Sequence, residues 1–112
     1  MEIKDKIIVK TDFSDTPGAR YKSDGPNSGE LFLEKFLTKK FNNAVNGNYK
    51  ILIDLDGVWG YPSSFVSGSF GKLSIDFGAE KVLNHITFKS DDNSIRLENI
   101  LKEIKNPKKK DQ

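Results

Sequence analysis

The chain has 112 residues, 36% of them hydrophobic and 30% charged, with no cysteine and a net charge of +2, which fits one domain with a single core and excludes disulfide bridges and thiolate metal sites. The net charge comes from the last five residues, so the other 107 carry 15 basic and 15 acidic groups and lack the positive charge that attracts nucleic acid. No apolar run approaches the roughly 20 residues of a membrane span and no signal pattern opens the chain, so we expect a cytoplasmic protein that binds neither membrane nor nucleic acid and carries no metal or other cofactor.

The first expected element is a strand over residues 3–10. Its apolar run Ile7-Ile8-Val9 is short and β-branched, which is typical of strands. A long loop follows over residues 11–29, because this stretch is rich in Asp, Ser, Pro and Gly. Long ordered loops in a compact domain are often functional.

The first helix begins at the end of this loop and stops at Gly47. Either Asn27 or Ser28 can cap it, and Glu30 lies three residues after Asn27, which is the spacing of a capping box. Apolar side chains recur at helical spacing, namely Leu33, Phe36, Leu37, Phe41 and Val45.

The strongest predicted strand covers residues 49–55. Its unbroken run of Ile51, Leu52 and Ile53 predicts a strand that is buried on both faces and has parallel neighbours. We therefore expect all three side chains to be nearly inaccessible in a central strand, flanked by the strands around Val9 and Ile86. Residues 56–62 form a turn.

A second helix follows, capped by Ser63 or Ser64 and closed at Gly78. Its core face is formed by Val66, Phe70, Leu73 and Phe77. A third strand is expected over residues 82–89, with His85 near its start. His85 has no Ser, Cys or second His at useful spacing, so a structural role is favoured over a catalytic or metal-binding one.

The last helix is capped by Asp91 or Asp92. Leu97, Ile100, Leu101 and Ile104 form its core face. Pro107 stops this helix, so residues 1–105 are expected to form the domain and residues 106–112 a disordered basic tail. Strands and helices alternate, which predicts an α/β fold with a mostly parallel or mixed sheet of about four strands and three or four packed helices.

Several stretches carry a family resemblance. The chain resembles the central part of a STAS domain, the module of sulfate transporters and anti-sigma factor antagonists. The resemblance lies in residues 51–58 and in Ser63-Ser64-Phe65 at the start of the next helix. More closely, residues 17–21, 25–32, 60–65 and 70–73 resemble the bacterial STAS-like family of unknown function.

The resemblance implies a STAS-like fold and a non-enzymatic regulatory or protein-interaction module in bacterial signalling. It also implies a protein partner, such as a kinase-like regulator. In anti-sigma antagonists a kinase phosphorylates a Ser at the start of the corresponding helix, and Ser64 matches that position best. Those proteins have Asp and Gly near the Ser, where this chain has Pro62 and Phe65.

The expected partner surface comprises Trp59, Tyr61, Ser63, Ser64 and Phe65. Aromatic residues at the carboxyl end of a parallel strand lie where open α/β sheets bind ligands, and aromatics often anchor interfaces. Two interpretations stay open for Trp59, which either projects as an anchor or folds back over the core. Likewise, Ser63 and Ser64 are either simple helix caps or, at Ser64, a phosphoacceptor.

One alternative function is a nucleotide or phosphate sensor. The loop before the first helix presents backbone N–H groups at Asn27, Ser28 and Gly29, and Arg20 could meet an anion bound there. The loop lacks the Lys-Ser/Thr ending of a P-loop and the spacing of a dinucleotide fingerprint. A capping turn is the simpler interpretation.

A second alternative is a small phosphatase-like enzyme. Asp54 and Asp56 follow an apolar strand at the spacing of a nucleophile and its general acid, as in haloacid-dehalogenase-type phosphatases. Asp91-Asp92 could then be cast as the magnesium-binding pair, although these residues are better explained as a helix cap. Only 56 residues follow Asp56, and such enzymes need a far larger domain. The sequence therefore favours a binding module.

Overall fold

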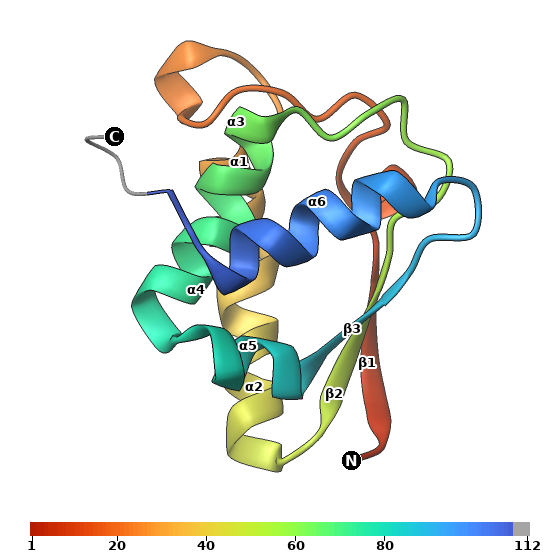
Figure 1. Cartoon of the computed structure of the whole chain (residues 1–112), viewed down its shortest axis with the longest axis vertical. Helices are drawn as coiled ribbons and strands as arrows, with labels where there is room; N and C mark the ends of the chain where they lie inside the picture. Colours follow the sequence, from red (N-terminus) through yellow and green to blue (C-terminus); the bar gives the residue numbers. More distant parts are fainter. Residues whose placement is uncertain (109–112) are drawn as a thin grey trace.

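A parallel sheet of three strands lies at the centre of the protein, which the computed structural model describes over residues 1–108. The strands are β1 (Ile3–Ile8), β2 (Lys50–Asp54) and β3 (Ile86–Lys89), in the order β1-β2-β3 (Figure 1). The prediction of a parallel sheet with this central strand is confirmed. The described residues contain three strands rather than about four.

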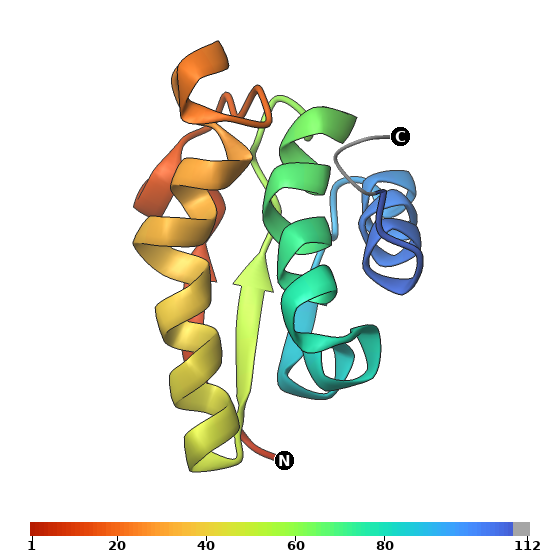
Figure 2. The same cartoon turned by 90° about the vertical axis from the view of Figure 1, so that its left-hand side faces the viewer.

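Burial alternates along β2. Ile51 and Ile53 are fully buried, whereas Leu52 is half-buried. The prediction that all three are inaccessible is therefore wrong for Leu52. The long helices cover only one face of the sheet (Figure 2), and Leu52 lies on the other face, where its neighbours in register are Lys6 and Thr87.

The first long helix is continuous from α1 (Gly29–Phe32) through a π-helical turn, η3 (Leu33–Leu37), into α2 (Thr38–Gly47). Ser28 is its cap, because the Ser28 hydroxyl accepts the Leu31 N–H at 3.0 Å. The capping box does not form, since Glu30 accepts the backbone N–H of Lys22 instead.

The second long helix runs from α3 (Ser63–Val66) through η4 (Ser67–Gly71) into α4 (Lys72–Phe77). Its N-cap residue is Pro62 and no side chain caps it, so the prediction that Ser63 or Ser64 caps this helix is wrong. Both long helices contribute to an aromatic cluster against the sheet. Its rings are Phe13, Phe32, Phe36, Phe65 and Phe70.

The segment before β3 is helical where the sequence predicted a strand. The chain breaks at Gly78, whose φ of +91° suits glycine, and re-enters a helix as α5 (Ala79–His85). The strand prediction over residues 82–85 is wrong because Val82 faces the core from a helix rather than a strand. His85 has a structural role, since its Nδ1–H donates to the carbonyl of Tyr49 at 2.9 Å.

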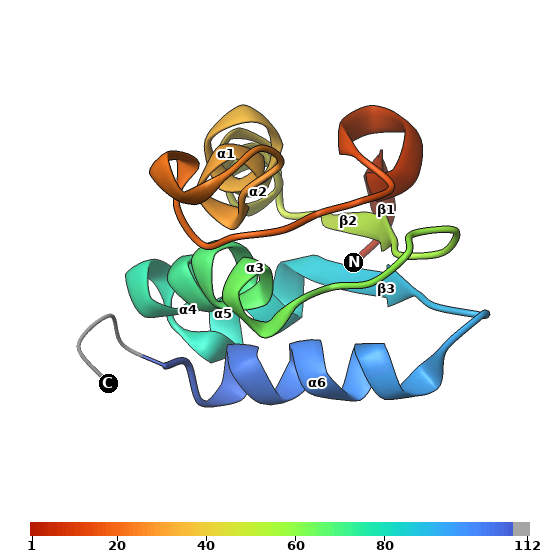
Figure 3. The same ribbon diagram turned by 90° about the horizontal axis from the view of Figure 1, so that it is seen from above.

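The last helix, α6 (Ser94–Lys105), lies across α4 and α5 beyond the β3 edge of the sheet (Figure 3). Its cap is Asn93, whose Oδ1 accepts the backbone N–H groups of Ile95 and Arg96, so the predicted caps Asp91 and Asp92 are wrong. After the helix, Lys108 N–H donates to Glu103 at 2.9 Å. The rest of the predicted disordered tail, residues 109–112, lies outside the described residues.

The strand β1 forms one edge of the sheet and ends in a π-helical turn, η1 (Val9–Phe13). Two backbone N–H groups on this edge bond to carboxylates instead of to another strand. Lys6 N–H donates to its neighbour Asp5 at 2.8 Å, and Ile8 N–H donates to Asp12 at 2.7 Å. Within the described residues, no helix is both long and apolar enough to cross a bilayer.

Candidate functional site

The loop from β2 to α3 follows the carboxyl end of the central strand and carries the one tryptophan of the chain. Leu55 and Val58 in this loop are buried, whereas Trp59 is 83% exposed. The backbone N–H of Trp59 donates to the carbonyl of Asp15 at 2.9 Å, which ties the loop to the segment after η1. The indole therefore projects into solvent from an anchored backbone, and the interpretation that it folds back over the core does not hold.

Tyr61 braces the same loop from inside. Its hydroxyl donates to the carbonyl of Leu55 at 2.9 Å, and the Arg96 guanidinium lies 5.2 Å from the centre of its ring. Burial raises the pKa of the Tyr61 hydroxyl above its usual range. Tyr61 is half-buried, so it supports the surface around Trp59 and contributes only part of its own side chain to it.

The serines predicted for the site are the first two residues of α3. Ser63 is exposed and Ser64 half-buried. The first backbone bond of this helix runs from Val66 N–H to the carbonyl of Pro62, so Ser63, Ser64 and Phe65 have N–H groups without intrahelical acceptors. Phe65 itself is fully buried and belongs to the aromatic cluster rather than to a surface.

The carboxylates considered for catalysis form hydrogen bonds that shape the loops. Asp54 accepts the backbone N–H of Asp56 at 3.0 Å. Asp56 Oδ1 accepts the N–H groups of Asp91 and Asp92, and Oδ2 is paired with Lys89. The hydrogen bond from Lys89, helped by those backbone donors, lowers the pKa of Asp56 to about 2.

These bonds join the turn after β2 to the loop between β3 and α6. Gly57 N–H adds a further link by donating to the Asp92 carboxylate at 2.9 Å. Both oxygens of Asp56 are thus engaged, and the arrangement supports the turn interpretation rather than that of a nucleophile and general acid. Among residues 1–108, no group of His, Asp and Glu side chains is arranged to hold a metal ion.

The predicted phosphate loop is closed by its own hydrogen bonds. Gly29 N–H donates to the carbonyl of Ala19, and Glu30 N–H to that of Arg20, both at 3.0 Å. The next donor, Leu31 N–H, is taken by Ser28. Because the N–H groups of Gly29, Glu30 and Leu31 already have acceptors, the start of α1 is a capping turn in which the Gly29 N–H is not free.

Sequence reasoning missed Arg96 and Asp15. Arg96 supports Tyr61 from α6 and also approaches the carbonyl of Leu55, at 3.4 Å. Asp15 holds Trp59 through a backbone carbonyl. No pattern along the chain indicates either contact, because each joins segments that are distant in sequence.

Comparison with known proteins gives one family. A family model described as a STAS-like domain of unknown function matches residues 28–96, which is more than half of the chain. The match begins at the Ser28 cap and ends at Arg96, so it includes the loop with Trp59 and leaves Arg20 outside. No curated protein and no solved structure matches the chain.

Proposed function

Because the chain belongs to the family of STAS-like domains of unknown function, we propose that it is a non-enzymatic regulatory module that binds a protein partner. The proposed partner surface consists of Trp59, Tyr61, Ser63 and Ser64. The observation that carries the proposal is the 83% exposure of Trp59. An indole held in water buries a large apolar area when a partner covers it, and tryptophan is among the residues most enriched at interface anchors.

The backbone around Trp59 is held in place before any partner arrives. Val58 is buried, Trp59 N–H is bonded to Asp15, and the Tyr61 hydroxyl is bonded to Leu55. A surface that is already ordered loses less conformational entropy on binding. The loop also follows the carboxyl end of a parallel strand, the edge at which open α/β sheets bind ligands.

Phosphorylation of Ser64 by a kinase-like regulator is the proposed means of control, in a cytoplasmic signalling pathway. A phosphate there would add about −1.5 to −2 charges to the partner surface. The start of a helix stabilises negative charge, so the domain would stay folded while an acidic or apolar partner is repelled. Ser64→Asp imitates part of that charge.

The test is an affinity pull-down from native cytosol, followed by affinity measurements on the captured partner. Trp59→Ala should weaken binding more than about fivefold, the effect of losing an anchor of at least about 1 kcal/mol. The control is Ile3→Ala, because Ile3 is also exposed, at 52%, but lies at the start of β1, away from the proposed surface. If Trp59→Ala and Ser64→Asp both bind like the wild type, the partner surface lies elsewhere.

The non-enzymatic part of the proposal has a separate test. Wild-type protein and Asp54→Asn are incubated with magnesium and para-nitrophenyl phosphate. The two proteins should release product at the same background rate, because Asp54 and Asp56 are engaged in hydrogen bonds within the loops. A clear loss of turnover in Asp54→Asn would establish phosphatase activity and contradict the proposal.

A further inference from the structure

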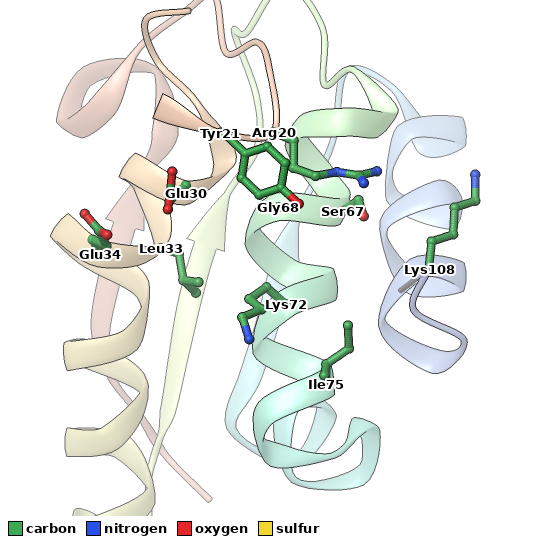
Figure 4. Close-up of a pocket in the computed structure, with 10 residues that line it drawn as sticks. All are labelled: Arg20, Tyr21, Glu30, Leu33, Glu34, Ser67, Gly68, Lys72, Ile75 and Lys108. Atoms are coloured by element: carbon green, nitrogen blue, oxygen red, sulfur yellow. The ribbon is translucent and has the colours of Figure 1, made fainter. Parts of the chain in front are cut away.

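A cleft lies between the two long helices, on the face of the helical layer that points away from the sheet (Figure 4). It has a volume of about 610 Å³, within the range of small-molecule sites. The residues that matter for its chemistry are Arg20, Tyr21, Leu33, Ser67, Ile75 and Lys108. They come from the loop before α1, from both long helices and from the segment after α6.

Two glycines let the loop and the helices meet at the upper end of this cleft. A Cβ on Gly68 would lie 2.7 Å from the carbonyl oxygen of Arg20, and one on Gly29 would clash with the carbonyl oxygen of Phe65. The backbone of Arg20 is therefore held directly against η4. As a result, the Arg20 side chain extends from a fixed backbone across Ser67 (Figure 4).

Among residues 1–108, the guanidinium of Arg20 has no anionic partner. Within residues 1–108 it forms no ion pair, and its Nε is shielded from solvent without a hydrogen bond. An enclosed donor without an acceptor is costly and calls for a compensating group. Ser67 is 6% exposed, and its hydroxyl also has no hydrogen-bond partner among the described residues.

The two acidic side chains of the cleft, Glu30 and Glu34, bond to Lys22 and form no ion pair with Arg20. Glu30 accepts the Lys22 backbone N–H at 2.9 Å, and Glu34 pairs with the Lys22 ammonium at 2.7 Å. On the basic side, Lys72 is paired with Asp76. This leaves the guanidinium of Arg20 and the ammonium of Lys108 as cationic groups without ion-pair partners among the described residues of the cleft.

We propose that this cleft binds a small organic anion. Its carboxylate or phosphate group would be held by Arg20, Ser67 and Lys108, because arginine and hydroxyl donors suit both kinds of oxyanion. Its apolar body would lie against Ile75, which is 40% exposed in the free protein. This site is independent of the partner surface around Trp59.

The experiment is a two-dimensional ¹H–¹⁵N NMR titration with four probes: phenyl phosphate, benzoate, inorganic phosphate and phenol. The chain has two arginines, Arg20 and Arg96, and the Nε of each is shielded from solvent. Phenyl phosphate or benzoate should shift the Nε–H signal of Arg20 and the amide signals of Ser67 and Gly68. The Nε–H signal of Arg96, which lies beside Tyr61, serves as the internal control and should not move.

Comparison of phenyl phosphate with benzoate shows whether the cleft prefers a phosphate or a carboxylate group. Tighter binding of either organic anion than of inorganic phosphate and phenol supports the proposal. Arg20→Gln should weaken binding of the better probe at least fivefold. Ser67→Ala should weaken it at least twofold, which keeps the test valid if Arg20→Gln fails to fold. The proposal is overturned if neither organic anion shifts these signals, if phenol binds equally well, or if Ser67→Ala and folded Arg20→Gln bind like the wild type.

Discussion

Lys89 at the end of β3 and Asp56 after the end of β2 form an ion pair that closes the carboxyl edge of the sheet. The Asp56 carboxylate is the more enclosed partner, at 19% exposed against 43% for the Lys89 side chain. Its other oxygen receives two backbone N–H groups from the loop after β3. One carboxylate thus holds together the turn and the loop that support the proposed partner surface.

The stability of the domain should therefore depend on pH through Asp56. Its pKa of about 2 in the folded protein lies below the value of about 3.9 expected in the unfolded chain, so its contribution is fully present above pH ~4 and is lost as pH falls from there toward 2. Asp56→Asn should cost about 1–3 kcal/mol at pH 7, because charged and backbone hydrogen bonds are weakened.

Urea unfolding at pH 7 and pH 3 measures this effect. The gap between the wild type and Asp56→Asn should narrow at pH 3. Asp76→Asn is the matched control, since Asp76 also pairs with a lysine but only on the exposed side of α4, and it should cost less than about 1 kcal/mol. A gap for Asp56→Asn that is equally wide at both pH values would contradict the assignment.

Two serines at helix starts should respond differently to alanine. Ser28 is fully buried and its hydroxyl accepts the Leu31 N–H, so Ser28→Ala should lower the free energy of unfolding by about 0.5–2 kcal/mol. Ser64 makes no cap bond, so Ser64→Ala should change it by less than about 0.5 kcal/mol. Chemical denaturation of both variants decides the matter, and equal losses would show that the cap assignment is incorrect.

Alanine at Gly68 should destabilise the contact between the loop and η4. Its Cβ would lie 2.7 Å from the Arg20 carbonyl oxygen, and the strain should outweigh the better helix propensity of alanine and leave a net loss of about 1–2 kcal/mol. Gly60→Ala is the control, because nothing lies within 4 Å of a Cβ at Gly60. Thermal unfolding should separate the two variants, and a Gly68→Ala protein as stable as the wild type would disprove the close contact.

The tyrosine of the loop should contribute to the stability of the domain, whereas the tryptophan should not. Tyr61→Phe removes the hydroxyl that donates to Leu55 and should cost about 0.5–1.5 kcal/mol of stability. Trp59→Phe alters a side chain that is 83% exposed and should stay within about 0.5 kcal/mol of the wild type. Urea unfolding measures both, and a larger loss for Trp59→Phe would mean that the indole packs on the core.

Periodic and unbroken apolar runs predicted most of the fold. The run at Ile51–Ile53 identified the central strand correctly, because such a run is stable only next to other strands and under a packed layer. The same run overestimated the burial of Leu52, because the sequence does not say how many faces of the sheet the helices cover. The helix α5 before β3 was missed because the chain turns at Gly78, with a φ of +91°, and then enters a new helix. The residue types alone do not indicate that a second helix begins there.

Caps and site contacts were harder to predict, since tertiary contacts decide among nearby candidates. Asp91 and Asp92 have good capping side chains, yet their N–H groups are bonded to Asp56 and the cap falls to Asn93. The position of Trp59 after the central strand was predicted from the chain, whereas its exposure was left open, because the bond to Asp15 that anchors its backbone joins segments distant in sequence. The cleft beside Arg20 could not be predicted, because it depends on how closely the loop before α1 approaches Gly68.

The carboxylates on the outer side of β1 limit how this sheet can grow. An unprotected edge strand offers a row of donors onto which another molecule can add its own strand, and chains of such additions lead to aggregation. Here Asp5 and Asp12 already occupy the outward N–H groups of Lys6 and Ile8. A neighbouring copy that sought to extend the sheet would have to displace both carboxylates, so concentrated solutions of this domain are protected from strand-by-strand polymerisation at that edge.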